Sequence, residues 1–178
     1  MTKKSQYNKR SRSSLLTLIR MGAMTCPIAW ATEIEIPESL RGNAPGDLVS
    51  VERTGQYSSE QLNDILKEIG LPEPIEVSNG ISVYRVKYLT TNHDDNVVTA
   101  SGLLATPVDV AANRVVSYQH GTSVQRESAP STPGLGEGLF VASVVAGRGG
   151  IAIAPDYIGL GLGSELPPYM HRAHAGST

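Results

Sequence analysis

Hydrophobic residues alternate with polar ones most regularly between residues 81 and 107. The segment "ISVYRVKYLTT" (81–91) has period 2, and the apolar run "VVTASGLLATP" (97–107) follows it. Between them lies "NHDDN" (92–96), whose asparagine and aspartate residues are typical of turns. The pattern therefore predicts two strands that form an antiparallel hairpin.

The period changes to that of a helix in "SSEQLNDILKEIG" (58–70). Ser58 and Gln61 have the spacing of a capping box, and Gly70 supplies a stop signal. One face of this helix is apolar, formed by Leu62, Ile65, Leu66 and Ile69. Residues 32–57 mix proline, glycine and charge with little period, so we interpret them as a surface lead-in.

Apolar runs return in the second half of the chain. We predict a strand at 114–120, a helix at 137–150 and a short buried strand of the parallel type at 151–157. A hairpin followed by strand, helix and strand implies an α/β protein with a mixed sheet.

Charge divides the chain into two parts. Six of its 15 basic residues and none of its 17 acidic residues lie in residues 1–31, so residues 32–178 carry a formal charge of −8. An acidic body disfavours nucleic-acid binding, which needs a basic face to neutralise phosphate.

The first 31 residues have the order of a secretory signal peptide, with a basic stretch followed by "LLTLIRMGAMTCPIAWA". Cleavage is expected after Ala31, which places the mature protein outside the cell or in the periplasm. Arg20 interrupts the apolar stretch, so a disordered basic arm is the alternative. The stretch is too short and too interrupted for a stable membrane span. Cys26, the single cysteine, would leave with the signal, and Thr25 before it disfavours a lipoprotein anchor.

The candidate functional motifs lie where the predicted strands end, or shortly after. Residues 118–122 read "YQHGT", residues 155–161 read "PDYIGLG" and residues 168–171 read "PYMH". With these three motifs in this order, residues 80–172 resemble the N-terminal half of a secreted α/β-hydrolase, similar to the secretory lipase and esterase families. The resemblance implies an incomplete α/β-hydrolase fold, an ester or lipid substrate and no cofactor. It divides the chain into a signal peptide (1–31), a lead-in (32–79) and a hydrolase half-domain (80–178).

The resemblance also implies roles for individual residues. His120, Gly121 and Thr122 would form the oxyanion-hole turn, in which the Thr122 N–H donates to the developing negative charge, Gly121 permits close approach and His120 orients the turn. A histidine that merely ends a strand is the alternative for His120. Asp156 would hold the next loop through backbone hydrogen bonds, and the glycines at 159 and 161 would allow its tight turn.

Two other chemistries fit the sequence less well. "GLGLGS" (159–164) is followed by a glutamate and two prolines, whereas dinucleotide binding needs a helix there, and the role of Ser164 is open. His171 and His174 are three residues apart, but no glutamate at a useful spacing and no HExxH motif accompany them, so we assign no metal site.

No Gly-x-Ser-x-Gly nucleophile motif occurs in the 178 residues, so none of the catalytic triad can be assigned. We expect the chain alone to be inactive toward esters. In the fold that it resembles, the strand at 114–120 would then be an open apolar edge, so we also expect self-association. Two alternatives stay open: a non-catalytic exported α/β domain or pseudogene product, and an unrelated small α+β binding module.

Overall fold

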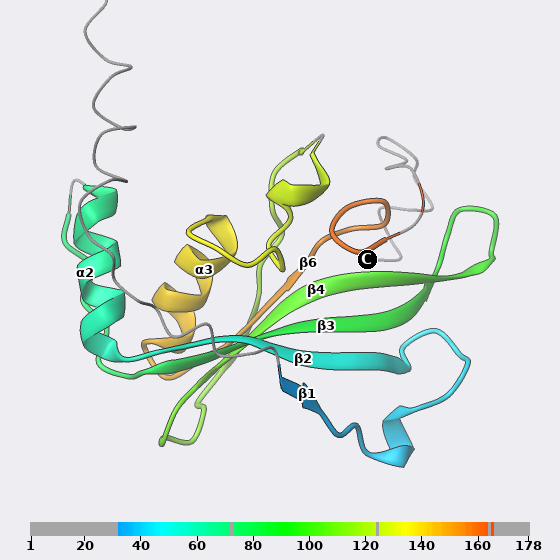
Figure 1. Cartoon of the computed structure of the whole chain (residues 1–178), viewed down its shortest axis with the longest axis horizontal. Helices are drawn as coiled ribbons and strands as arrows, with labels where there is room; N and C mark the ends of the chain where they lie inside the picture. The colour runs from blue at the N-terminus through cyan, green and yellow to red at the C-terminus, as the bar shows by residue number, and fades with distance from the viewer. Residues whose placement is uncertain (1–31, 72, 124, 164, 166–178) are drawn as a thin grey trace, which may run out of the picture.

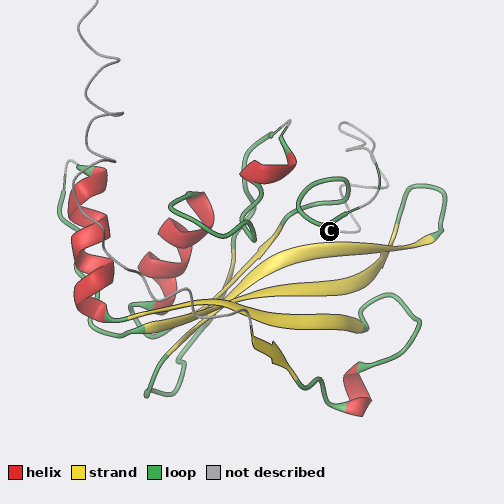
Figure 2. Cartoon of the chain, in the orientation of Figure 1, coloured by secondary structure: helices red, strands yellow, loops and turns green. Residues whose placement is uncertain are grey.

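The protein forms a mixed six-stranded sheet with helices on one face (Figures 1 and 2). The structure is a computed structural model that describes residues 32–71, 73–123, 125–163 and 165. Its strand order is β1-β2-β3-β4-β6-β5. The strands are β1 (Thr32–Ile34), β2 (Leu48–Tyr57), β3 (Ile81–Thr91), β4 (Val97–Pro107), β5 (Val115–Ser117) and β6 (Ile151–Pro155). The α-helices are α2 (Ser59–Ile69) and α3 (Glu137–Ala146), and the short 3-10 helices are η2 (Glu38–Leu40) and η3 (Arg126–Ser128).

The predicted hairpin is confirmed with the predicted bounds. Strands β3 and β4 pair antiparallel along their whole length, from Ile81 opposite Pro107 to Thr91 opposite Val97. The turn between them is built by Asn92, whose side-chain oxygen accepts from the N–H groups of Asp94 and Asn96 at 3.0 Å each. The asparagine therefore supplies the turn hydrogen bonds for which its residue type is favoured.

The interpretation of residues 32–57 as a surface lead-in missed two strands. β1 and β2 extend the sheet beyond β3, and β2 is ten residues long. Two register shifts interrupt its pairing with β3, one of them between Arg53 and Gly55. Such irregularities break the period-2 pattern from which a strand is recognised.

The helix at 58–70 is confirmed as α2. The Ser58 side chain accepts from the Gln61 N–H, and the Gln61 side chain accepts from the Ser58 N–H, which completes the capping box. Gly70 ends the helix in the left-handed conformation, with φ of 70°.

The strand–helix–strand unit is confirmed, with shorter elements than predicted. β5 and β6 pair parallel and are joined through α3, while β6 pairs antiparallel with β4. The helix ends at Ala146 instead of 150, because the chain turns back at the glycines that follow. Within the described residues, β5 is the last strand of the sheet.

One face of the sheet carries the core. The buried side chains of α2 and α3 pack on alternate positions of three strands, β3, β4 and β6. This cluster includes Leu62, Leu66, Ile81, Val83, Leu103, Ala105, Leu139, Val141, Ala142, Ala152 and Ala154. On the opposite face, Tyr84 and Leu104 are half-buried and Ile153 is 42% exposed. None of the helices in the described part of the chain is long and apolar enough to cross a membrane.

Candidate functional site

The two sequence motifs lie at the same edge of the sheet. Because β5 and β6 run parallel, the turns that follow Ser117 and Pro155 leave the sheet side by side. In open α/β sheets, this carboxyl end of the strands is where ligands bind. The structure therefore brings residues 120–122 and 156–161, which the sequence analysis singled out separately, to the same edge of the sheet.

His120 joins the two turns. Its side chain is buried, at 6% exposure, and both ring nitrogens lie near carbonyl oxygens. Nε2 lies 3.2 Å from the Asp156 oxygen and Nδ1 lies 2.7 Å from the Gly121 oxygen. With a backbone carbonyl beside each ring nitrogen, neither nitrogen is directed into solvent, and the ring bridges the two turns.

Gly121 and Thr122 differ from His120, because both are exposed. Within the described residues, neither of their backbone N–H groups donates to a hydrogen bond. A Cβ atom at Gly121 would meet nothing within 4 Å, and its φ lies outside the left-handed range. Neither local packing nor backbone conformation in the described structure therefore requires a glycine at this position.

Tyr157 holds the turn from the β6 side. Its ring stacks on that of His120, with centroids 4.2 Å apart, and its hydroxyl donates to the His120 carbonyl at 3.2 Å. The backbone of Tyr157 has φ of 65°, which costs an aromatic residue about 1 kcal/mol or more. Surrounding contacts must offset that strain, and the two contacts with His120 contribute.

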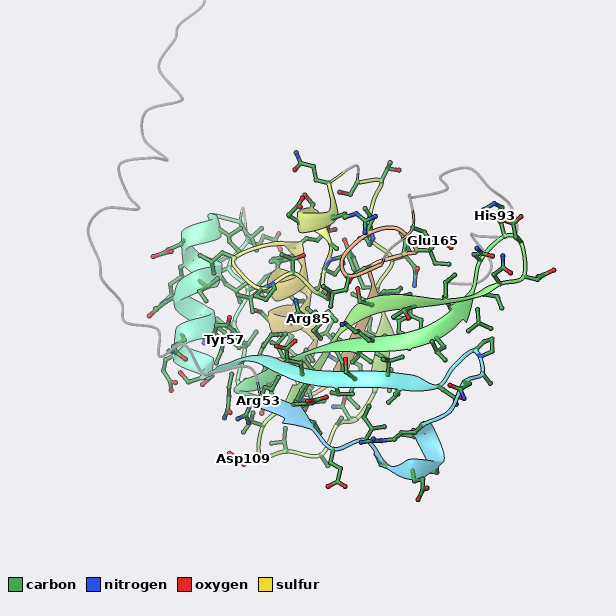
Figure 3. The ribbon with its side chains drawn as sticks, turned by 45° about the vertical axis from the view of Figure 1, so that its right-hand side comes forward. Arg53, Tyr57, Arg85, His93, Asp109 and Glu165 are labelled. Carbon is green, nitrogen blue, oxygen red and sulfur yellow. The ribbon has the colours of Figure 1, made fainter. Side chains whose placement is uncertain are left out.

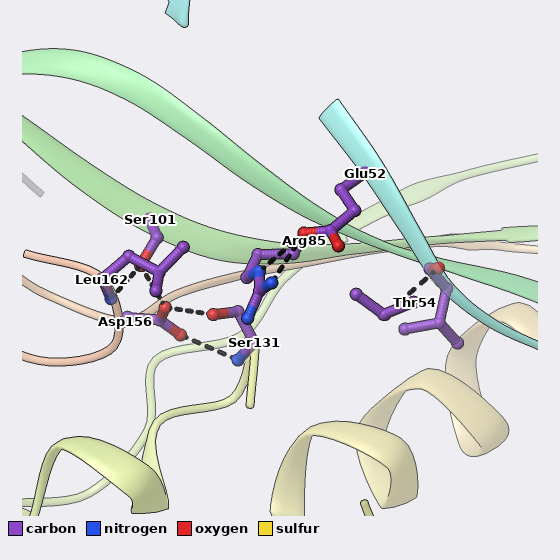
Figure 4. A network of polar contacts seen from close by, with 8 residues as sticks. Glu52, Thr54, Arg85, Ser101, Ser131, Asp156 and Leu162 are labelled. Carbon is purple, nitrogen blue, oxygen red and sulfur yellow. Dashed lines mark hydrogen bonds and ion pairs between the residues drawn. The ribbon is translucent and has the colours of Figure 1, made fainter. Parts of the chain in front are cut away.

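Asp156 is fully buried and its carboxylate ties three segments together (Figure 4). One oxygen accepts from the Ser131 N–H at 2.8 Å. The other accepts from the hydroxyl of Ser101 at 2.6 Å and from the hydroxyl of Ser131. The Ser101 oxygen in turn accepts from the Leu162 N–H at 3.0 Å. Strand β4, the loop after β5 and the turn after β6 are thus linked through one buried carboxylate.

The glycines after Asp156 are required by this packing. Gly159 and Gly161 have φ of 90° and 53°. A Cβ atom at Gly161 would overlap the Asp156 carboxylate and would lie 2.6 Å from the Ser101 hydroxyl. The turn therefore needs glycine at 161 on both conformational and steric grounds.

A second set of contacts, which the sequence analysis missed, joins the same loops further out. The Arg126 guanidinium, carried by η3, donates to the carbonyl oxygens of Gly163 and Glu165. The Asn92 side chain donates to the Glu165 carboxylate at 3.0 Å, and Figure 3 shows Glu165 beside the hairpin end that carries His93. Residues 37 to 73 positions apart make these contacts, so no local motif reveals them.

Two tyrosines near the site have perturbed acidity. Burial, and then the negative charge of Asp156, raise the pKa of Tyr88 to about 12. The hydrogen bond that Tyr118 donates to Glu137 raises the pKa of the Tyr118 hydroxyl. Both tyrosines are therefore neutral at physiological pH, so neither is prepared to act as a base there.

The described residues hold no group of three or more His, Cys, Asp or Glu side chains that could bind a metal ion. Ser164, the "PYMH" motif and the histidines at 171 and 174 lie outside the described residues. An apolar pocket of about 530 Å³ lies between α2 and the start of α3, but none of the candidate residues named above lines it.

Comparison with known proteins places this geometry in context. A solved structure from Legionella pneumophila, provisionally described as a hydrolase, superposes with a TM-score of 0.65 and 30% identity over 73% of this chain and 36% of that one. A mutant of LipA, a rice cell wall degrading esterase from Xanthomonas oryzae, superposes with a TM-score of 0.59 and 22% identity over 75% of this chain and 35% of that one. A ligand-bound form of LipA gives 0.56 and 20% over the same shares.

These likenesses establish an α/β-hydrolase-like fold. The chain spans about a third of the length of the solved structures that it matches. No protein-family model matches the sequence. A search of curated proteins finds no significant match either.

Proposed function

We propose that this chain supplies the oxyanion-hole half of a serine ester hydrolase of the lipase or carboxylesterase type. The observation that carries the proposal is that Gly121 and Thr122 are exposed and that neither of their N–H groups donates to a hydrogen bond within the described residues. They lie on the turn that begins at His120. The contact of the His120 ring with the Asp156 carbonyl and the hydrogen bond from the Tyr157 hydroxyl to the His120 carbonyl hold this turn in place. The likeness at 30% identity to a protein provisionally described as a hydrolase supports a hydrolytic reaction.

The chemistry follows from where charge develops. When a serine oxygen attacks an ester carbonyl, the carbonyl oxygen becomes an oxyanion. An N–H group already aimed at that position stabilises the tetrahedral intermediate by about 2.7–4 kcal/mol, because no reorganisation is needed at the moment of reaction. In the proposed enzyme the Thr122 N–H is that donor, and an ester or lipid is the substrate. No serine in the described residues is assigned as the nucleophile.

The proposal extends to localisation. Residues 1–31 would act as a signal peptide cleaved after Ala31, giving a secreted or periplasmic enzyme. N-terminal sequencing of the protein recovered from periplasm and medium tests this part, and an intact, cytoplasmic Met1 end would contradict it.

The test of activity uses the product of the gene including any coding sequence that follows codon 178. We expect hydrolysis of p-nitrophenyl butyrate and labelling by a serine-directed phosphonate. Thr122→Pro removes the N–H and should lower kcat about 10²- to 10³-fold. Thr122→Ala keeps the N–H and is the matched control.

Two results would contradict the proposal: an unlabelled, inactive longer product, or a Thr122→Pro variant with full activity. The 178-residue chain alone should show no turnover. Phosphonate-sensitive turnover by that chain would show instead that it already holds a nucleophile.

A further inference from the structure

We propose that Tyr157 and the His120 ring are positioning residues, which orient two consecutive peptide groups so that the Gly121 N–H faces the substrate together with the Thr122 N–H. The two rings hold the carbonyl of each peptide group, and each N–H is thereby directed to the opposite side. This inference rests on the proposed function and adds a second donor to it, the Gly121 N–H.

The first peptide group joins His120 to Gly121. The Tyr157 hydroxyl, whose proton is shared with the Gln119 side-chain oxygen, donates to the His120 carbonyl at 3.2 Å. In a trans peptide group the C=O and the N–H lie in one plane and point in opposite directions. Because Tyr157 holds the His120 carbonyl, it also sets the direction of the Gly121 N–H, which points away from the tyrosine.

The second peptide group joins Gly121 to Thr122. Its carbonyl oxygen lies 2.7 Å from the His120 Nδ1, whereas the His120 Nε2 lies 3.2 Å from the Asp156 oxygen. A carbonyl oxygen only accepts, and a neutral imidazole carries one N–H, so the shorter contact places that proton on Nδ1. The Thr122 N–H belongs to the same peptide group and therefore points away from the His120 ring.

The two rings form one support. They stack with centroids 4.2 Å apart and planes 26° apart, so both carbonyls are directed toward a single pair of rings. In a strand, successive carbonyls point to opposite sides, and the turn departs from that pattern. The result is two adjacent N–H groups, at Gly121 and Thr122, directed away from the same support. Adjacent N–H groups of this kind can bind one negatively charged oxygen together.

The backbone of Tyr157 supports a role for its side chain. Its φ of 65° is left-handed, like those of Gly159 and Gly161 in the same turn, which are 90° and 53°. Glycine adopts this conformation without the steric cost that a side chain brings. The turn thus has glycine at two left-handed positions and a tyrosine at the third, where the hydroxyl reaches the His120 carbonyl. Strained residues of this kind cluster at functional sites.

The orientation of the first peptide group matters most in the transition state. If the peptide group between His120 and Gly121 rotated, its carbonyl would replace its N–H on the substrate side and would repel the oxyanion. A donor fixed beforehand stabilises the charge that develops on the substrate oxygen, because it needs no reorganisation. The ester carbonyl of the bound substrate carries much less charge. Loss of the Tyr157 hydroxyl should therefore lower kcat and leave KM nearly unchanged.

The kinetic test uses the product of the gene with any coding sequence after codon 178, with active sites counted by phosphonate titration. Tyr157→Phe keeps the ring and should lower kcat per titrated site about 10- to 100-fold, with KM within about twofold. Tyr118→Phe is the matched control, since its hydroxyl donates to Glu137 and not to the turn. Its kcat should stay within about twofold of the unmodified value. A loss of folded protein lowers the number of titrated sites and not the kcat of each site.

A second measurement does not depend on activity. NMR of the same product, isotope-labelled at the nitrogens of glycine and histidine, reports the ring protonation of His120 and the order of the Gly121 N–H. We expect a protonated Nδ1. The order parameter of the Gly121 N–H should fall from about 0.85 to below about 0.6 in Tyr157→Phe and stay unchanged in Tyr118→Phe.

The outcomes separate this inference from the proposed function. An inactive, unlabelled product would end the proposed function, and the order parameters would still decide whether Tyr157 orients the turn. An active enzyme whose kcat is equal in Tyr157→Phe and Tyr118→Phe would overturn the positioning role alone. An unchanged Gly121 order parameter, or a bare Nδ1 on His120, would overturn it too.

A pair of histidine variants serves should Tyr157→Phe fail to fold. His120→Asn places an amide near the position of Nδ1, whereas His120→Gln places it near that of Nε2. Because Nδ1 holds the carbonyl of the second peptide group, the Asn variant should keep at least about tenfold more kcat per titrated site than the Gln variant. Equal values, or the reverse order, would contradict the inference.

Discussion

The turns after β5 and β6 lie side by side but are built in opposite ways. After β6, the Asp156 carboxylate is fully buried and accepts three hydrogen bonds from two serines. A Cβ at Gly161 would collide with that carboxylate. After β5, by contrast, Gly121 and Thr122 are exposed, and their N–H groups donate to nothing within the described residues.

This difference indicates which turn is the support and which is available to a ligand. A buried carboxylate with all its bonds satisfied fixes the geometry around it, because breaking any one bond leaves a buried polar group unpaired. An exposed N–H on a neighbouring turn keeps its hydrogen-bonding capacity for another molecule. His120 connects the two, since its ring is buried on the supporting side and its backbone leads into the exposed side.

The largest expected effect is that of Asp156→Ala. It leaves the Ser131 N–H and the Ser101 hydroxyl without their buried acceptor. We expect the free energy of unfolding to fall by about 3–5 kcal/mol. Urea denaturation followed by circular dichroism measures it. Asp64→Ala, whose exposed carboxylate pairs with Lys67, is the control and should change stability by less than about 0.5 kcal/mol. Equal effects of the two variants would show that the buried network is not the support.

A pair of glycine substitutions compares the two turns directly. Gly161→Ala forces a Cβ toward Asp156 at φ of 53° and should destabilise by about 2–3 kcal/mol. Gly121→Ala places its Cβ in open space and should change stability by less than about 0.5 kcal/mol. The same urea titration serves for both. A large cost at Gly121 would mean that the exposed turn is also constrained by the fold.

The same contrast explains how much the sequence could predict. Regular periodicity identified the β3–β4 hairpin to the residue, and the capping box identified α2. Strand β2 was missed because Glu52 and Gly55 contradict a strand pattern locally. Glu52 is accommodated by Arg85 of β3, which donates to it at 2.6 Å, and Gly55 follows a register shift. Pairing with β3 thus stabilises a strand that the local sequence pattern does not predict.

At the site, the motifs marked the two turns, but neither the proximity of these turns nor the residues that bond to Asp156 were predicted. Ser101 and Ser131 are 55 and 25 positions away from it, so their contacts depend on the folded sheet. One signal was present in the sequence: Ser101 is a polar residue within the apolar run 97–107. A buried polar side chain needs a partner, and that need could have pointed to a network.

The stability of the protein at alkaline pH tests the surroundings of Asp156, because the Tyr88 hydroxyl responds to that carboxylate. Its pKa is about 12 in the folded protein, against about 10 when unfolded, because burial and then Asp156 disfavour the anion. Folding thus favours the neutral form. The contribution of Tyr88 to the free energy of unfolding is therefore constant below pH 10 and is lost as pH rises toward 12. Tyr88→Phe should reduce the alkaline loss of stability by about 2 kcal/mol at pH 12. Urea midpoints measured from pH 8 to 12 test this, and parallel curves for the two proteins would contradict the raised pKa of Tyr88.

The smallest expected effect is the most specific to the exposed turn. Tyr157→Phe removes the hydroxyl, whose single proton is shared between His120 O and the Gln119 side-chain oxygen, at 3.2 Å each. It retains a ring that can stack on His120. Stability should fall by about 0.5–1 kcal/mol, because these bonds lie near solvent. Amide hydrogen exchange should quicken at Gly121 and Thr122 and stay unchanged at Ser131, whose N–H donates to buried Asp156. Faster exchange at all three would mean that the two turns open as one unit. No change at any of them would assign the anchoring of the exposed turn to the His120 ring, whose contact with the Asp156 carbonyl the substitution leaves in place.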